Sequence, residues 1–147
     1  MNRATLSLSL QFADTTDRAV LPRHKVLRWL RATLCVPAEI TVRVVDAREG
    51  RQLNRDYRGL DHATNVLTFD YQREPAVVAD LIVCGAVVRR EATRQHIDVQ
   101  AHYAHMLVHG ALHAQGMDHR DDAEAQMMEA AESRILLALG FEDPYRR

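Results

Sequence analysis

Residues 77–85 read VVADLIVCG, an almost unbroken apolar run that ends at a glycine. An apolar run of this length predicts a strand that is buried on both faces, in the middle of a sheet. Beyond Gly85 the spacing of apolar residues changes from a strand-like to a helical period. The stretch therefore predicts where the sheet ends and where a helical half of the chain begins.

Upstream of this stretch, expected strands and helices alternate. Residues 5–12 alternate apolar and polar side chains, which indicates a half-buried strand, whereas residues 21–34 carry apolar side chains at helical spacing. The whole pattern predicts strands over residues 5–12, 39–46, 65–70 and 77–84, and helices over residues 21–34, 47–57, 86–96, 99–115 and 121–139. The predicted fold class is α+β, or α/β-like: a single domain over residues 1–147 with a small sheet of about four strands and about five helices packed on it.

Composition narrows the class of protein. The chain has 147 residues and a formal net charge of −1, which argues against a generally basic nucleic-acid coat but leaves room for a local basic groove. Cys35 and Cys84 lie in apolar runs, so we expect two buried free thiols and no disulfide. We expect no signal peptide, and the sequence has no apolar run of about 18 residues. We therefore expect a soluble, cytoplasmic protein without a membrane segment.

The motif that carries chemistry is HGALHAQGMDH, residues 109–119. His109 and His113 are four residues apart in a predicted helix and therefore project from the same face. Gly116 allows the chain to reverse, and His119 follows three residues later. Three imidazoles with an open fourth position are typical of a catalytic zinc site, since structural zinc sites are closed by four protein ligands. Copper, nickel and iron remain open as alternatives to zinc.

A plainer interpretation is that these are ordinary histidines of a histidine-rich helix. His102 and His105 continue the same stripe and favour that interpretation. The glycine and the further histidine after it argue for a metal, because amphipathic packing requires neither of them. We expect His105, one turn before His109, to contact a metal ligand or the substrate. We expect Asp118 to orient His119 or to cap its turn.

Gly110 distinguishes this motif from that of the metzincin metalloproteases. Those enzymes share the histidine spacing but carry a glutamate directly after the first histidine, where this chain has Gly110. In peptide hydrolysis the glutamate takes a proton from the metal-bound water, so its absence disfavours a protease. We expect the glycine to leave an empty space beside the metal, which a negatively charged phosphodiester could occupy.

A second stretch, residues 53–69, reads LNRDYRGLDHATNVLTF and leads from a helix end through a polar loop into a strand. This stretch and the histidine motif together resemble the YbeY family, the metal-dependent endoribonucleases of bacterial ribosomal RNA maturation. The resemblance spans most of the chain. It implies a small mixed sheet with helices, with the metal in a cleft at the sheet edge. It also implies that His109, His113 and His119 are zinc ligands.

The resemblance assigns further roles outside the histidine motif. Arg58 matches an arginine important for catalysis, which would hold the scissile phosphate. Thr64 and Asn65 match the loop that leads into the strand beside the site. From the residues alone, Arg58 could instead be a surface arginine or the ion-pair partner of Asp61.

The function that follows is a zinc-dependent, single-strand endoribonuclease that acts in ribosomal RNA maturation and ribosome quality control. One zinc ion is the expected cofactor, and ribosomal RNA with the ribosome or small-subunit assembly factors are the expected partners. The sequence leaves the nucleophile open among water, a metal hydroxide and the RNA 2′-hydroxyl, and it identifies no general base. A zinc-stabilised ribosome-assembly protein without catalysis remains an alternative, as does the less favoured metalloprotease. The chain departs from the family at Leu60 and Ala63, where lysine and proline are frequent, and neither position is an expected metal ligand.

Overall fold

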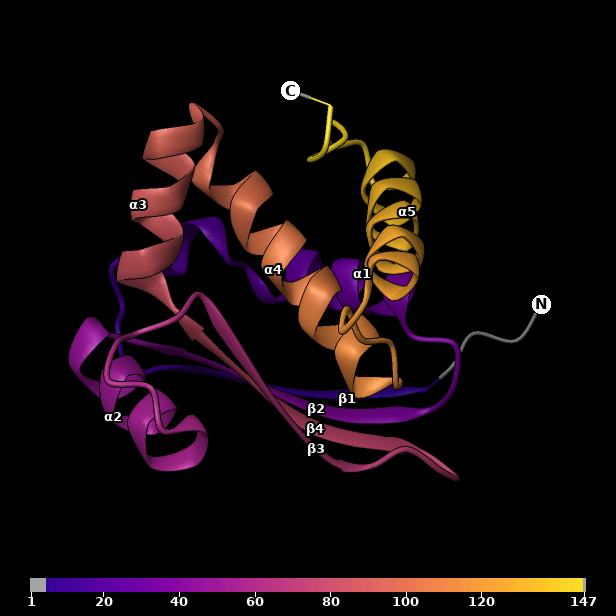
Figure 1. Cartoon of the computed structure of the whole chain (residues 1–147), viewed down its shortest axis with the longest axis horizontal. Helices are drawn as coiled ribbons and strands as arrows, with labels where there is room; N and C mark the ends of the chain where they lie inside the picture. The colour runs from indigo at the N-terminus through magenta and orange to yellow at the C-terminus, as the bar shows by residue number, and fades with distance from the viewer. Residues whose placement is uncertain (1–4, 147) are drawn as a thin grey trace.

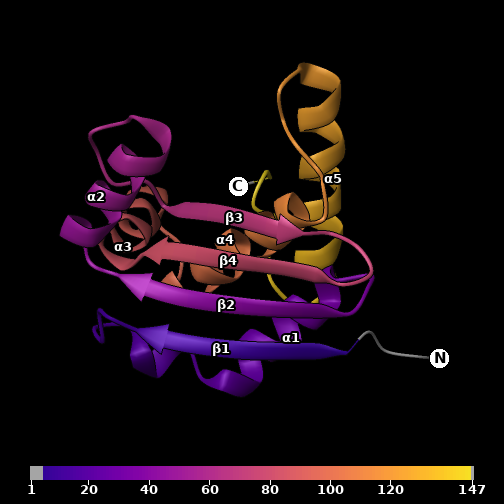
Figure 2. The ribbon, with the colours of Figure 1, turned by 90° about the horizontal axis from the view of Figure 1, so that it is seen from below.

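The apolar run at residues 77–84 is strand β4 (Val77–Cys84), and it lies inside a four-stranded sheet (Figure 1). The computed structural model describes residues 5–146, and within them the strand order is β1-β2-β4-β3 (Figure 2). β4 runs parallel to β2 and antiparallel to β3, so the sheet is mixed. The other strands are β1 (Leu6–Phe12), β2 (Ala38–Val45) and β3 (Val66–Gln72), which lies at one edge.

The helices follow the predicted positions closely. Within the described residues they are α1 (Arg23–Thr33), α2 (Ala47–Arg58), α3 (Gly85–Gln95), α4 (Val99–Ala114) and α5 (Asp122–Ala138). Figure 1 shows α1, α4 and α5 over one face of the sheet, and α4 packs against β3 and β4. No helix between residues 5 and 146 has the length and apolar character needed to cross a membrane. The predicted single α+β domain with a small mixed sheet is confirmed.

The side chains at the end of β4, residues 81–84, are buried on both faces of the sheet, as the apolar run predicted. Leu81 and Val83 point into the main core beneath α4, whereas Ile82 and Cys84 belong to a smaller core with Leu67 on the other face. Burying one such aliphatic side chain completely contributes roughly 1.5–3 kcal/mol. β4 therefore stabilises both layers of the fold at once.

α4 lies close to the sheet at Gly110. A Cβ atom at this position would lie 3.1 Å from Leu81 Cδ2 and 3.3 Å from Thr68 Oγ1. The expectation that Gly110 leaves an empty space beside the metal is therefore wrong, because the glycine faces β3 and β4 and its neighbours fill the space. The close packing of α4 on the sheet offsets the roughly 1 kcal/mol by which glycine disfavours a helix interior.

The prediction also fails in the connection between α1 and β2. Cys35 lies in this connection and is exposed, although its apolar neighbours in the sequence indicated burial. Cys84 is buried as predicted. α1 begins later than predicted because Pro22 occupies its N-cap with an extended backbone, and a 3-10 turn (Arg18–Val20) that was not predicted precedes it.

Candidate metal centre and cleft

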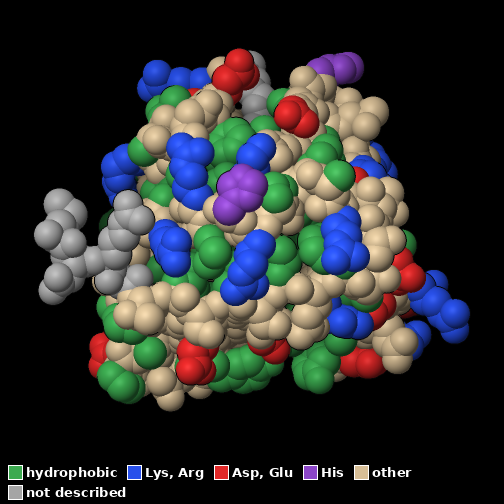
Figure 3. Space-filling model, turned by 180° about the vertical axis from the view of Figure 1, so that it is seen from behind, with side chains coloured by type: hydrophobic (Ala, Val, Ile, Leu, Met, Phe, Trp, Pro, Cys, Tyr) green, Lys and Arg blue, Asp and Glu red, His purple; other side chains and the backbone are tan. Residues whose placement is uncertain are grey.

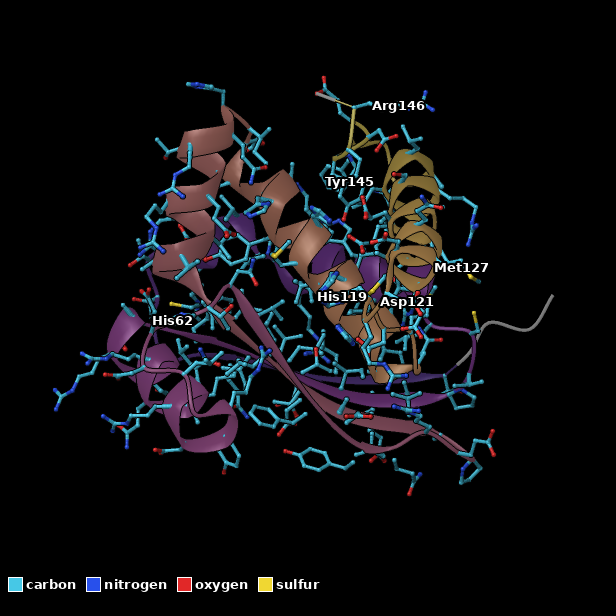
Figure 4. The ribbon with its side chains drawn as sticks, viewed as in Figure 1. His62, His119, Asp121, Met127, Tyr145 and Arg146 are labelled. Atoms are coloured by element: carbon cyan, nitrogen blue, oxygen red, sulfur yellow. The ribbon has the colours of Figure 1, made fainter. Side chains whose placement is uncertain are left out.

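Three histidines meet at the end of α4. His109 and His113 lie one turn apart on this helix, and His119 lies in the loop that follows (Figure 4). The ring centroids are 5.1 Å apart for His109 and His113, 5.6 Å for His109 and His119, and 5.1 Å for His113 and His119. Each residue offers a ring nitrogen within 4.8 Å of those of the other two. The structure thus brings together the three histidines that the motif spacing grouped.

The loop after α4 returns His119 to the end of the helix. Gly116 has a φ of +102°, a left-handed conformation that favours glycine, and its backbone N–H donates to the carbonyl of His113 at 2.9 Å. The carboxylate of Asp118 accepts a hydrogen bond from the backbone N–H of His119 at 2.8 Å. Asp118 therefore contacts the backbone of the residue that carries the third imidazole.

The donor set suits a transition metal. All three donors are imidazole nitrogens, which bind zinc, copper, nickel or iron. A histidine must be neutral to bind a metal, and burial lowers the pKa of His113, with a further contribution from the neighbouring His109 and His119. Within the described part of the chain, no cysteine, carboxylate or fourth histidine joins the cluster. A four-coordinate metal held by these three side chains would therefore keep one position for a substrate or water.

Glu132 of α5 forms a buried hydrogen bond with one of these histidines. Its Oε2 accepts a hydrogen bond from Nδ1 of His109 at 3.1 Å. The proton on Nδ1 leaves the lone pair of Nε2 available to a metal, so this contact selects the ring tautomer that a ligand needs. Glu132 is only 1% exposed, so bulk water does not compete for this carboxylate.

The second oxygen of Glu132 has two donors of its own. Oε1 accepts hydrogen bonds from Nε2 of His105 at 2.5 Å and from the hydroxyl of Tyr145 at 2.7 Å. Burial opposes ionisation of Glu132, but the hydrogen bonds from His105, His109 and Tyr145 outweigh it and lower the pKa of Glu132 to about 2. Figure 4 shows Tyr145 in the C-terminal segment beside α5. The carboxylate is thus ionised at neutral pH and joins His105 to the candidate ligand His109.

Glu132 was not among the predicted site residues, although the sequence carries a signal for it. The residue lies four positions after Met128 and four before Leu136, and each of these two is 1% exposed. A glutamate in the buried stripe of an amphipathic helix needs a buried partner, because an unpaired charge in a core is strongly unfavourable. The histidines of the neighbouring helix are the natural candidates for that partner.

A cleft of about 730 Å³ opens beside the three histidines, along the edge strand β3. Its volume is within the range of about 300–1,000 Å³ that is typical of ligand sites. Arg58, Thr64, Asn65 and Asp118 line the cleft together with the three histidines. The expected site residues therefore gather at the sheet edge, except for His105, which lies behind the site against Glu132.

Arg58 offers its positive charge to this cleft. It is the last residue of α2, which Gly59 closes with a left-handed φ of +70°. Asp61, which the sequence offered as an ion-pair partner for Arg58, instead binds Arg51 through two hydrogen bonds of 2.8 and 2.9 Å. Arg58 is exposed and forms no ion pair within residues 5–146, so its guanidinium is available to an anion.

The side chain of Asn65 is held by the protein. Its Nδ2 donates to Oε1 of Glu91 at 3.2 Å, and its Oδ1 accepts from the backbone N–H of Val66 at 2.7 Å. The same Glu91 oxygen lies 2.9 Å from Nε2 of His102. Asn65 therefore anchors the cleft loop to α3 and α4, and His102 has the structural partner expected of a packing histidine.

The fold and the site together define a small α+β protein with a three-histidine centre that could hold a metal ion. The family model described as Endoribonuclease YbeY matches residues 10–140. The chain therefore belongs to the Endoribonuclease YbeY family.

Individual relatives agree with this assignment. "Endoribonuclease YbeY" of Methylibium petroleiphilum is 67% identical over 143 residues, which cover 97% of this chain and 96% of the relative. The protein of the same name from Delftia acidovorans is 57% identical and covers 100% of both chains. The solution structure of TM1509 from Thermotoga maritima has the same fold, with a TM-score of 0.67 at 22% identity over 95% of this chain and 99% of that one.

Proposed function

We propose that this chain is a metal-dependent endoribonuclease that cleaves single-stranded RNA, with one zinc ion held by His109, His113 and His119. The observation that carries the proposal is that these imidazoles and the exposed guanidinium of Arg58 line the same cleft. A metal cation beside an arginine suits a substrate that carries a phosphodiester. The relatives named endoribonuclease support RNA as the substrate.

The site residues have separate roles in the proposed cleavage of RNA. A zinc ion held by the three histidines would supply Lewis acidity and would lower the pKa of a water molecule bound to it. Arg58 binds a phosphate oxygen and stabilises the charge that builds up on the phosphate in the transition state. Glu132 keeps the ring of His109 in the ligand tautomer and orientation.

Peptide hydrolysis is disfavoured by the surroundings of Gly110. A metzincin places its catalytic glutamate at this position of the motif. In this chain the position holds a glycine, and a Cβ atom there would already lie 3.1 Å from Leu81 and 3.3 Å from Thr68 of the sheet. The site therefore lacks both the carboxylate and the room for it.

We assign the activity to ribosomal RNA maturation and ribosome quality control in the cytoplasm. The ribosome, or factors that assemble its small subunit, would be the partners. Membership of the endoribonuclease family supports an RNA substrate, and the resemblance of the two motifs implies that this RNA is ribosomal. A radiolabelled precursor of ribosomal RNA, compared with an unrelated single-stranded RNA of equal length, would test this preference.

The deciding experiment measures metal content and RNA cleavage in the same protein samples. The wild-type protein should hold one metal ion per chain and cleave a single-stranded oligoribonucleotide. His113→Ala should lose both properties, whereas Arg58→Ala should keep the metal and lose cleavage. Arg31→Ala is the control, because Arg31 is an exposed cation on α1 and does not line the cleft. Figure 3 shows several Lys and Arg side chains on this face of the molecule.

Two results would contradict the proposal. Cleavage that persists in both His113→Ala and Arg58→Ala, at the same folded fraction, would place the activity elsewhere or in a contaminant. A pure wild-type protein that holds zinc but cleaves no RNA would favour the alternative, a zinc-stabilised binding protein without catalysis. In that case His113→Ala would lower the melting temperature and change nothing else.

A further inference from the structure

Tyr57 is a large aromatic residue with a solvent-exposed side chain. It lies in the last turn of α2, directly before Arg58, and is 68% exposed. An exposed aromatic ring is not by itself informative, because much of any protein surface is apolar. Tyr57 is informative because it lines the same cleft as Arg58 and the three histidines.

A second aromatic residue supports the ring of Tyr57. Phe69 of β3 also lines the cleft, and its ring meets that of Tyr57 at a centroid distance of 5.0 Å and an interplanar angle of 71°. This edge-to-face contact is a favourable aromatic geometry. Phe69 itself packs against the smaller core on the far face of the sheet. The phenylalanine thus fixes the position of the tyrosine while most of the tyrosine surface stays exposed.

We propose that Tyr57, supported by Phe69, is a stacking site for one unpaired nucleobase of the RNA strand whose phosphate Arg58 binds. Every base has a flat π-face, so an exposed aromatic ring beside a phosphate site binds single-stranded nucleic acid without strong sequence preference. A base that remains paired in a duplex cannot present its face to the ring. This inference rests on the proposed function, and it explains a restriction of that function to single strands.

The chain offers a matched control for Tyr57. Tyr71 lies on the same strand as Phe69 and is 65% exposed, but it does not line the cleft. Its hydroxyl donates to the carboxylate of Asp80 at 2.8 Å. Tyr57 and Tyr71 therefore match in residue type and exposure, and differ in access to the site.

The first test measures binding in the absence of cleavage. Fluorescence anisotropy with a ten-nucleotide oligoadenylate, in excess chelator, should show that Tyr57→Ala weakens binding about 5- to 150-fold, the range for the loss of one stacked base. Tyr57→Phe should bind like the wild type, because stacking needs the ring and not the hydroxyl. Tyr71→Ala should also bind like the wild type. Equal losses in Tyr57→Ala and Tyr71→Ala, or no measurable binding by the wild type, would overturn the proposal.

The second test locates the stacked base. Oligoadenylates that each carry one abasic nucleotide should bind the wild type more weakly at one position only. At that position Tyr57→Ala should cause no further loss, whereas additive losses at every position would exclude contact between the ring and a base. The binding result does not depend on catalysis. If the protein stacks a base but does not cleave RNA, the proposed nuclease function is wrong and the base site stands. If the protein cleaves RNA but does not stack a base, the nuclease function stands and the base site is wrong.

Discussion

The carboxylate of Glu132 lies 3.1 Å from Nδ1 of His109, which joins the last long helix to the histidine cluster through a buried contact. The two residues are 23 positions apart in the sequence. Partners that orient a metal-binding histidine in this way typically change metal affinity or activity by about 10- to 100-fold when they are removed. The pair therefore allows the metal site to be tested through a residue that does not itself bind the metal.

Glu132→Gln should lower zinc affinity about 10- to 100-fold, because the amide loses the charge that favours the Nδ1-protonated ring of His109. Isothermal titration calorimetry of the metal-free protein would measure the change. Glu129→Gln removes an exposed carboxylate from the same helix and should leave the affinity unaltered. Equal affinities for all three proteins would show that Glu132 has only a packing role.

The same glutamate should make the stability of the metal-free protein depend on acidity. Its pKa is lowered to about 2, so the folded state favours the ionised form, and its contribution is complete above about pH 4.5. The contribution should be lost as the pH falls through 2, by roughly 3 kcal/mol in all. Urea unfolding between pH 5 and pH 2 should therefore show a steeper loss of unfolding free energy in the wild type than in Glu132→Gln. A parallel loss in both proteins would contradict the assignment.

Gly110→Glu should unfold or strongly destabilise the protein. The new side chain would meet Leu81 and Thr68 in the packed layer between α4 and the sheet, where overpacking alone costs about 1–3 kcal/mol and an unpaired carboxylate adds to it. Thermal unfolding would report the loss, with Ala123→Glu at an exposed position of α5 as the control. A stable Gly110→Glu protein that hydrolyses peptides would restore the protease alternative.

Arg58→Ala should lower kcat/KM for RNA by about 100- to 1,000-fold, the cost typical of removing one group that stabilises transition-state charge. Arg58→Lys should recover part of the loss, because lysine keeps the charge but not the two-pronged geometry of the guanidinium. Zinc content should be the same in all three proteins. Loss of zinc from Arg58→Ala would mean that the residue supports the fold of the site and not the substrate.

Cys35 and Cys84 should differ in reactivity towards a thiol reagent. Cys35 is exposed and Cys84 is buried, so the native protein should react rapidly at one thiol, and at the second only after unfolding. Absorbance with an aromatic disulfide reagent would count the thiols, and Cys35→Ser should remove the fast phase. Two slow thiols in the native wild type would favour the burial that the apolar neighbours of Cys35 indicated.

Local patterns in the sequence were sufficient to predict the helices, the strands and the grouping of the three histidines. The period of apolar residues placed four strands and five helices, because the side-chain periods of strands and helices are intrinsic to the backbone. The spacing of His109, His113 and His119 around Gly116 predicted their convergence for the same reason, since one helical turn and one reversal determine it. These features depend on residues that are near one another in the chain.

Contacts between distant segments could be decided only by the tertiary structure. The side chain of Glu132 meets His105 and His109 because α5 packs on α4, and the ring of Tyr57 meets Phe69 because the end of α2 lies beside the edge strand. The surroundings of Gly110 were also decided by the tertiary structure. Its position in the motif predicted space beside a metal, but the packing of α4 on the sheet fills that space. Periodicity determines which face of an element is apolar, but the energy of packing decides which element covers that face, and packing depends on the whole chain.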